Sequence, residues 1–214
     1  MDKINISLAK PFGPSIAKVT IPEDMILKLN NYIDEVIKDE EKIKLQDHGR
    51  NLAGQVTQEF ILDNKFSESS GWLKFLGTCT AQWLKISGLP EVKQFDLIST
   101  WVVRQFKGEY NPTHWHNGHI SGVGYLKVPD DLGDKAQDSK KNNPNGQLEL
   151  IHGTRQFLSQ STFRIKPKVG EFYFFPNYMM HTVYPFKNTN EERRSISFNA
   201  KVDEHVYNVY ANRN

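Results

Sequence analysis

The second half of the chain is a succession of short strand-like runs, and this pattern limits the fold more than any other feature. Each run is rich in β-branched and aromatic residues, and Pro, Gly, Asn and Asp separate one run from the next. Such spacing predicts antiparallel strands arranged in a sandwich or a jelly roll. The expected strands cover residues 98–106, 120–128, 147–151, 162–165, 171–175 and 195–202.

The first half of the chain has a helical pattern instead. Apolar residues recur every three or four positions over residues 22–39 and again over residues 72–86, so we expect two helices there. Pro22 suits a first helical turn, and Gly88 and Pro90 end the second helix. The predicted fold class is therefore mainly β with N-terminal helices.

Three further stretches complete the layout. Residues 4–8 alternate between apolar and polar and predict a short strand, whereas residues 43–65 are mixed and predict loops. Residues 129–146 are polar and predict a long exposed loop that could serve as a lid. We expect a helical support region over residues 1–91, packed on the sheet of a β core over residues 92–214, in one structural domain.

Composition limits the partners and the compartment. The 214 residues carry a formal charge of +2, with basic residues spread along the chain, which argues against nucleic-acid binding. Met1–Asn5 lacks the apolar core of a signal peptide, and no run approaches the ~18 apolar residues of a membrane span. The single cysteine, Cys79, excludes an intramolecular disulfide and reads as a core residue. We expect a cytoplasmic protein of a bacterium or a virus-infected host, with no membrane partner and with a homodimer as the base-rate assembly.

Three histidines form the clearest chemical pattern. His114 and His116 are separated by one residue, and His181 follows an aromatic strand much later. Side chains at i and i+2 of a strand point to the same face, so the pair can bind one metal. A third imidazole from a distant strand would complete a three-ligand set with open positions for substrate. His119 is a competing candidate, although at three positions after His116 it would point differently on a strand, and the remaining histidines are interpreted as ordinary polar residues: His48, His152 and His205.

A row of polar residues follows the third histidine. Arg193, Ser195, Ser197 and Asn199 alternate along an expected strand and should face one direction. Polar side chains on one face of an otherwise apolar strand suggest a bound polar ligand. Arg194 should face the other way, although a slip of one residue would exchange the two arginines.

These pieces, in this order and spacing, resemble the iron(II)/2-oxoglutarate-dependent oxygenases, specifically the small prolyl-hydroxylase-like group. The resemblance covers residues 101–202, about the C-terminal half of the chain. It implies a double-stranded β-helix with iron at its mouth. The stretches that carry it are residues 111–116, 121–126, 170–176, His181 and residues 192–199.

The resemblance also implies roles for individual residues. By position, His114 and His181 would be histidine ligands of Fe(II). Arg193 would hold the distal carboxylate of 2-oxoglutarate through a bidentate pair, with Ser195 and Tyr125 as further contacts. Other candidate residues near the cosubstrate are Arg194, Ser197, Asn199 and Phe106.

One position departs from the family pattern. The usual motif has Asp or Glu where this chain has His116. A neutral set of three histidines still binds Fe(II), because imidazole suits iron, so we expect His114, His116 and His181 as the metal ligands. The departure leaves open whether 2-oxoglutarate binds in the usual way and whether another metal is preferred.

The sequence favours an oxygenase that consumes 2-oxoglutarate, releases succinate and CO2, and hydroxylates a small-molecule or peptide substrate. A peptidyl or free amino acid such as proline is the suggested class. Two alternatives stay open. One is a three-histidine cupin-like metalloenzyme that does not use 2-oxoglutarate, and the other is a non-catalytic jelly-roll module. Candidate substrate contacts are Arg104, Arg155 and Arg164.

Overall fold

The computed structural model describes residues 13–208 and residue 210, so the strand expected at residues 4–8 lies outside the described residues. The helices are α1 (Glu23–Ile37), α2 (Glu40–Gln46), α3 (Asn64–Ser69), α4 (Trp72–Ile86) and α5 (Glu204–Tyr207). The strands are β1 (Ala17–Thr20), β2 (Gln58–Ile61), β3 (Phe95–Gln105), β4 (Asn111–His114), β5 (Ile120–Lys127), β6 (Leu148–Ile151), β7 (Thr162–Ile165), β8 (Glu171–Pro176), β9 (Met180–Val183) and β10 (Arg193–Val202).

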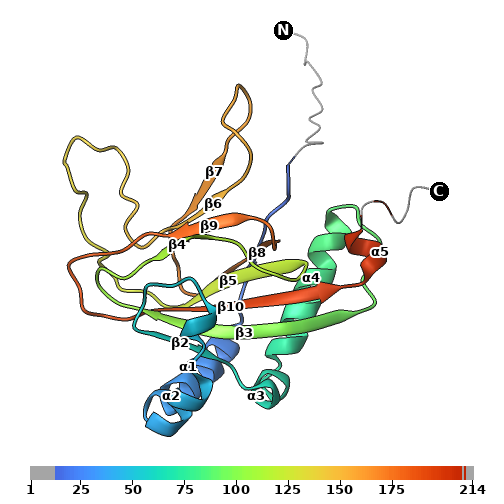
Figure 1. Cartoon of the computed structure of the whole chain (residues 1–214), viewed down its shortest axis with the longest axis horizontal. Coiled ribbons are helices and arrows are strands. Elements are labelled where there is room, and N and C mark those ends of the chain that lie inside the picture. The colour runs from blue at the N-terminus through green and yellow to red at the C-terminus, as the bar shows by residue number, and fades with distance from the viewer. Residues whose placement is uncertain (1–12, 209, 211–214) are drawn as a thin grey trace.

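Two antiparallel sheets form the β core (Figure 1). The large sheet has the strand order β1-β8-β5-β10-β3-β2, and the small sheet has the order β4-β9-β6-β7. Side chains from both sheets share one buried cluster, so the sheets pack face to face. The predicted jelly-roll class, mainly β with N-terminal helices, is confirmed.

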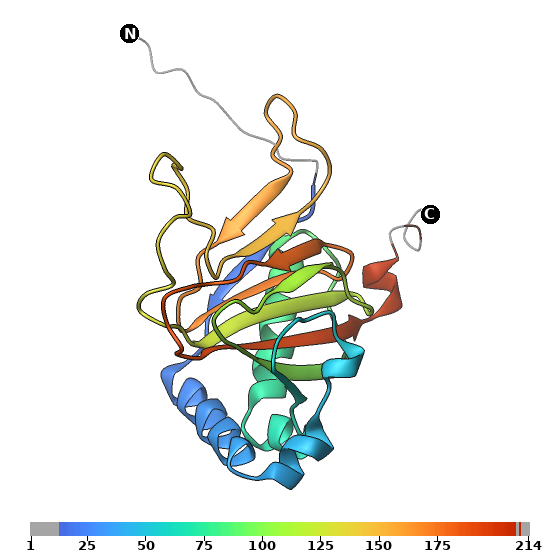
Figure 2. The same ribbon diagram turned by 60° about the vertical axis from the view of Figure 1, so that its left-hand side comes forward.

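The other face of the large sheet is covered by helices. Figure 2 shows α1 and α4 lying against the sheet on the side away from β6 and β7. Trp72 of α4 is fully buried and meets Phe172 of β8 edge to face, with ring centroids 5.5 Å apart. Leu29 and Ile33 of α1 are buried in the same cluster, and each large apolar side chain there contributes about 1.5–3 kcal/mol.

Two glycines of β5 make room for this aromatic layer. A Cβ added to Gly124 would lie 2.2 Å from the ring of Phe172, and one added to Gly122 would lie 2.5 Å from the ring of Phe198. Both contacts are far below van der Waals distance. Glycine at these two positions therefore admits core rings and neighbouring backbone.

The expectation of loops over residues 43–65 is wrong. That stretch contains the end of α2, a 3₁₀ turn at Gly49–Asn51 and the edge strand β2. β2 is only four residues long and pairs with β3 on one side, so its sequence signal is weak. The strands β1, β4 and β9 and the helix α3 were likewise not expected, and each has six residues or fewer. Residues 129–146 contain no helix or strand, as predicted.

Candidate active site

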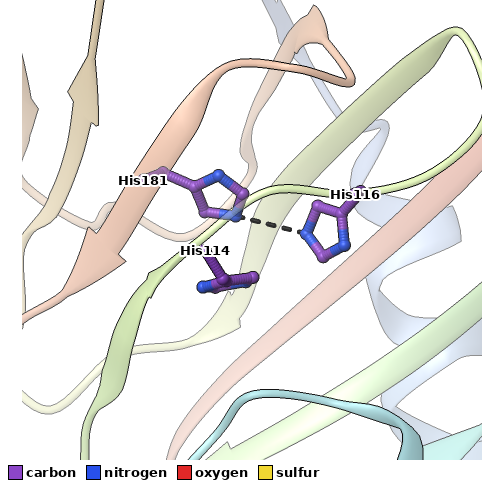
Figure 3. Close-up of side chains that lie close together, drawn as sticks. All are labelled: His114, His116 and His181. Atoms are coloured by element: carbon purple, nitrogen blue, oxygen red, sulfur yellow. Dashed lines mark hydrogen bonds between the residues drawn. The ribbon is translucent and has the colours of Figure 1, made fainter.

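Three histidines converge between the two sheets (Figure 3). His114 ends β4 and pairs directly with His181 of β9, while His116 follows two residues later. One ring nitrogen from each of the three residues lies within 4.8 Å of the others. The Nε2 atoms of His116 and His181 are 3.2 Å apart. The expected grouping of these residues is therefore present in the structure.

Backbone carbonyls orient two of the rings. The Nδ1 atom of His114 lies 2.7 Å from the carbonyl oxygen of Pro112, and Nδ1 of His181 lies 2.9 Å from that of Met179. A carbonyl oxygen only accepts hydrogen bonds, so each Nδ1 carries the proton and each Nε2 keeps its lone pair. Histidines that bind metals commonly have this arrangement.

The surroundings also keep the imidazoles neutral. Burial, together with the neighbouring His181 and His114, lowers the pKa of His116 to about 3. Burial likewise lowers the pKa of His181 to about 3. Neutral imidazole is the form that binds a metal, so the cluster needs no deprotonation at neutral pH. Three neutral nitrogen donors fit Fe(II).

Asn177 supports the loop that carries His116, and sequence analysis did not find it. The backbone N–H of His116 donates to the carbonyl oxygen of Asn177 (3.1 Å), and the Asn177 side-chain amide donates to the carbonyl oxygen of His116 (3.3 Å). Trp101 packs against the His116 ring, with centroids 5.3 Å apart. The His116 ring is thus fixed from two directions. An Asn just after Pro176 gives only a turn signal in sequence.

The histidines open onto a small cavity that continues between the sheets. Tyr125, Arg193, Ser195 and Ser197 line it from the large sheet. The cavity thus joins the candidate metal ligands to the polar row expected on β10.

Arg193 is a buried cation without a carboxylate partner among the described residues. It is 1% exposed, and its Nη1 donates to the side-chain oxygen of Gln105 (2.7 Å). Its guanidinium lies 5.0 Å from the Tyr125 ring centroid. Within the described chain, Arg193 Nε and the Tyr125 hydroxyl have no hydrogen-bond partner. Each buried unpaired polar group costs about 1–3 kcal/mol, so these two groups fit an anionic ligand with several acceptor oxygens.

Several other residues predicted to contribute to the site do not line the cavity. Asn199 is buried on the same strand, where its side-chain oxygen accepts from the Ser121 hydroxyl (2.7 Å), and it does not line the cavity. Phe106 follows β3 and lies under the guanidinium of Arg104, also outside the cavity. Arg164 pairs with Glu149 and Arg155 is exposed, so the structure does not bring the candidate substrate arginines to the site.

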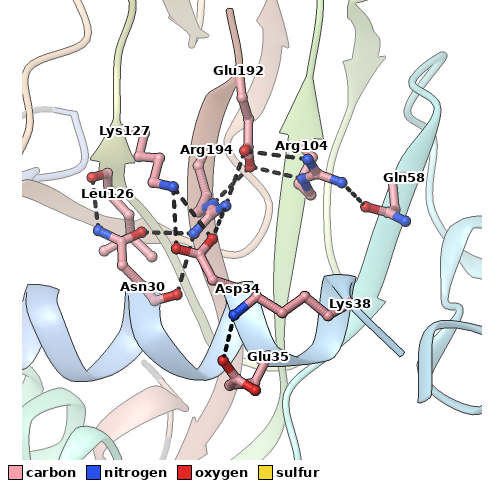
Figure 4. A network of polar contacts seen from close by, with 10 residues as sticks. All are labelled: Asn30, Asp34, Glu35, Lys38, Gln58, Arg104, Leu126, Lys127, Glu192 and Arg194. Atoms are coloured by element: carbon pink, nitrogen blue, oxygen red, sulfur yellow. Dashed lines mark hydrogen bonds and ion pairs between the residues drawn. The ribbon is translucent and has the colours of Figure 1, made fainter. Parts of the chain in front are cut away.

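Arg194 belongs to a separate ionic network on the helix side of the sheet (Figure 4). Its guanidinium donates to Asp34 of α1 (2.7 Å) and to Glu192 (2.6 and 2.9 Å). Glu192 also accepts from Arg104, which in turn contacts Gln58. This network ties α1 to β10 and β3. The structure therefore does not place Arg194 near the cosubstrate, because alternation along β10 sends it away from the cavity.

Glu59 of β2 is a cavity-lining carboxylic acid that sequence analysis did not find. Its side chain is among the residues around the cavity, with Asn111 close by. Burial raises the pKa of Glu59 to about 7. The charges of Asp47 and Glu109 also raise this pKa, whereas the Asn111 amide lowers it. The sequence gives little signal, because Glu59 lies in a four-residue strand, Gln58–Ile61, in which only Phe60 and Ile61 are apolar.

The comparisons with known proteins agree with this geometry. Residues 99–199 match the family model described as "Putative 2OG-Fe(II) oxygenase". Comparison with curated protein sequences gives no match. The matched segment begins in β3 and ends in β10, and it contains the three histidines, Tyr125 and Arg193. This segment is therefore similar to the 2OG-Fe(II) oxygenase family, and the similarity together with the three histidines implies Fe(II) and 2-oxoglutarate as the metal and the cosubstrate.

Solved structures share the fold at low sequence identity. A Pseudomonas putida prolyl-4-hydroxylase is 15% identical, with a TM-score of 0.55 over 86% of this chain and 91% of that one. A Trichoplax adhaerens prolyl hydroxylase, in complex with a hypoxia inducible factor oxygen degradation domain peptide fragment, is 14% identical, with a TM-score of 0.52 and coverages of 86% and 81%. AviO1 from Streptomyces viridochromogenes Tue57 is 12% identical, with a TM-score of 0.58 and coverages of 89% and 90%.

Within the described residues, every helix is too short or too polar to cross a lipid bilayer.

Proposed function

We propose that this protein hydroxylates a substrate by using Fe(II), O2 and 2-oxoglutarate, with release of succinate and CO2. One observation carries the proposal. Three imidazoles that can hold one metal share a cavity with a buried arginine, Arg193, that has no carboxylate partner among the described residues. The first group suits Fe(II), and the second suits a dicarboxylic acid.

His114, His116 and His181 would hold the iron in this scheme. Bound Fe(II) supplies the oxidative chemistry, in which 2-oxoglutarate loses CO2 and one oxygen atom of O2 enters the substrate. The carbonyl acceptors at Pro112 and Met179 keep two of the rings in the metal-binding tautomer. Phe175 packs edge-on against His181, with ring centroids 5.2 Å apart, and helps to exclude water from the ligands.

Arg193 would bind the distal carboxylate of 2-oxoglutarate. Its charge is held in place by a neutral partner, Gln105, so it stays available for an anion. Tyr125 offers a second buried donor, and Ser195 lines the cavity on the neighbouring strand. A bound carboxylate would accept hydrogen bonds from Arg193 Nε and the Tyr125 hydroxyl, which have no partner in the described part of the chain. This gain supports binding of the cosubstrate there.

A peptidyl or free amino acid such as proline is the proposed substrate class. Its support is the likeness of the fold to two prolyl hydroxylases, which is analogy at the level of the fold. We also propose a reducing, cytoplasmic setting, on the strength of the single cysteine.

The second candidate is a three-histidine metalloenzyme that does not use 2-oxoglutarate. The neutral His116, in place of the family's carboxylate, favours it because the charge of the site changes by one unit. Anaerobic addition of Fe(II) and then 2-oxoglutarate separates the two. A visible metal-to-ligand charge-transfer band after the second addition supports the first function, and iron binding without that band supports the other.

A further inference from the structure

Glu59 and the proposed carboxylate anchor lie in one row across the large sheet. Glu59 of β2 pairs with Val103 of β3, Val103 pairs with Ser195 of β10, and Ser195 pairs with Tyr125 of β5. All four residues line the cavity. Adjacent strands are about 4.8 Å apart, so the Glu59 backbone lies about 10 Å from Ser195. Glu59 therefore lies at the opposite end of the same cavity wall from Tyr125.

The carboxyl group of Glu59 lacks a cationic partner within the described chain. The residue is 3% exposed, and its Oε1 makes no hydrogen bond to any described residue. The charged groups that act on it are Asp47 and Glu109, which carry the same sign. Arg104 on the neighbouring strand is turned to the other face of the sheet, where it pairs with Glu192. This end of the cavity therefore attracts positive charge.

Gly54 creates the space in which the carboxyl group lies. A Cβ added to Gly54 would be 2.4 Å from Oε1 of Glu59 and 2.8 Å from its carboxyl carbon. Gly54 has no left-handed backbone that would require glycine, so the absence of a side chain serves this contact. Leu52 and Ala53, from the same loop, complete this part of the wall.

We propose that Glu59 selects the substrate by binding a protonated amine. The inference rests on the proposed function, because it places the amine in the cavity opposite Arg193. An ammonium group supplies both of the missing elements, a positive charge and hydrogen-bond donors, whereas a hydroxyl group supplies donors alone. The substrate class is therefore narrowed to molecules with a basic nitrogen, such as a free amino acid or a lysyl side chain.

The test compares amines with neutral molecules of the same shape. The probes are pyrrolidine against tetrahydrofuran and n-butylamine against n-butanol. Their dissociation constants are measured by ligand-observed NMR on protein loaded with 2-oxoglutarate and with diamagnetic Zn(II) in place of Fe(II). We expect both amines to bind about 10- to 100-fold more tightly than their neutral analogues, the range of a charge-assisted hydrogen bond.

Three variants assign any preference to Glu59. Glu59→Gln should abolish it, and Gly54→Ala should reduce it by displacing the carboxyl group without removing any polar atom. Glu41→Gln is the matched control, since Glu41 is exposed on α2 and pairs with Lys44, and it should leave the preference unchanged. If Glu59→Gln fails to fold, Gly54→Ala decides the question.

Equal binding of amines and neutral analogues to the wild-type protein would overturn the inference, as would undetectable amine binding. A preference that persists in Glu59→Gln would also overturn it. The charge-transfer band with Fe(II) and 2-oxoglutarate is recorded for each variant. If the wild-type protein lacks this band, the proposed function is wrong. If the band is present and Glu59→Gln keeps the same preference for amines, only the inference about Glu59 is wrong.

Discussion

Arg193 and Arg194 are neighbours in β10, yet their guanidinium groups lie on opposite faces of the large sheet. Both residues are 1% exposed. Arg193 faces the cavity and has a neutral partner, Gln105, whereas Arg194 faces α1 and pairs with Asp34 and Glu192. The first guanidinium is therefore free for an anionic ligand, and the charge of the second is already compensated.

Replacement of Arg193 should weaken the cosubstrate and spare the metal. In Arg193→Lys we expect the KM for 2-oxoglutarate to rise about 10- to 100-fold, because lysine cannot form a bidentate pair with a carboxylate. Steady-state succinate formation measures this change. Arg164→Lys, on the surface, is the matched control. An unchanged KM would place the cosubstrate carboxylate elsewhere.

Replacement of Arg194 should destabilise the fold and leave the binding of Fe(II) and 2-oxoglutarate intact. Arg194→Met removes the buried partner of Asp34 and Glu192, which keep Lys127 and Arg104 as second partners, so the free energy of unfolding should fall by about 1–3 kcal/mol. Urea denaturation measures the loss. At a temperature where the variant is folded, the charge-transfer band with Fe(II) and 2-oxoglutarate should persist. Loss of that band from folded protein would contradict the structural role.

Tyr125→Phe should separate stability from binding. The change removes a buried hydroxyl that has no partner within the described chain and keeps the ring beneath Arg193. We expect the free energy of unfolding to stay within about 1 kcal/mol of wild type or to increase, while the affinity for 2-oxoglutarate falls. Thermal denaturation and cosubstrate titration give the two values. A clear loss of stability would mean that the hydroxyl has a structural partner.

The three histidines should be needed together for iron binding. His181→Ala removes the most buried ligand, and we expect Fe(II) affinity to fall by more than the roughly 10- to 100-fold cost of losing an outer-shell partner. Anaerobic iron titration tests this prediction. His152→Ala changes an exposed histidine of the small-sheet side and should bind iron normally. Equal iron binding by both variants would exclude His181 as a ligand.

Ionisation of Glu59 should make the protein without ligand less stable as the pH rises. Burial raises its pKa from the ordinary 4.5 to about 7, so between these values the unfolded chain loses this proton while the folded chain keeps it. Stability is therefore lost across that window, by about 3 kcal/mol in total. Relative to wild type, Glu59→Gln should gain this amount between pH 4.5 and pH 8. Parallel pH profiles of urea denaturation for the two proteins would contradict the shift.

The longer elements were predictable because their patterns are local. Helix α4 coincides with the expected helix at residues 72–86, since its apolar stripe repeats over four turns. β10 was expected from its β-branched and polar alternation, and the strand period placed Arg193 and Ser195 on one face. Several short elements, such as the four-residue β2, were missed because they provide little periodic signal, although the equally short β6 and β7 were expected.

The sequence by itself determined the jelly-roll class and singled out His114, His116 and His181, because strand periodicity and the His-x-His spacing are properties of neighbouring residues. The tertiary structure excluded the slip of one residue that the sequence left open, since the register between β10 and β3 sends Arg193, and not Arg194, into the cavity. It also brought Glu59 and Asn177 to the site. Both reach it through pairing between segments far apart in the chain, and no local pattern encodes such contacts.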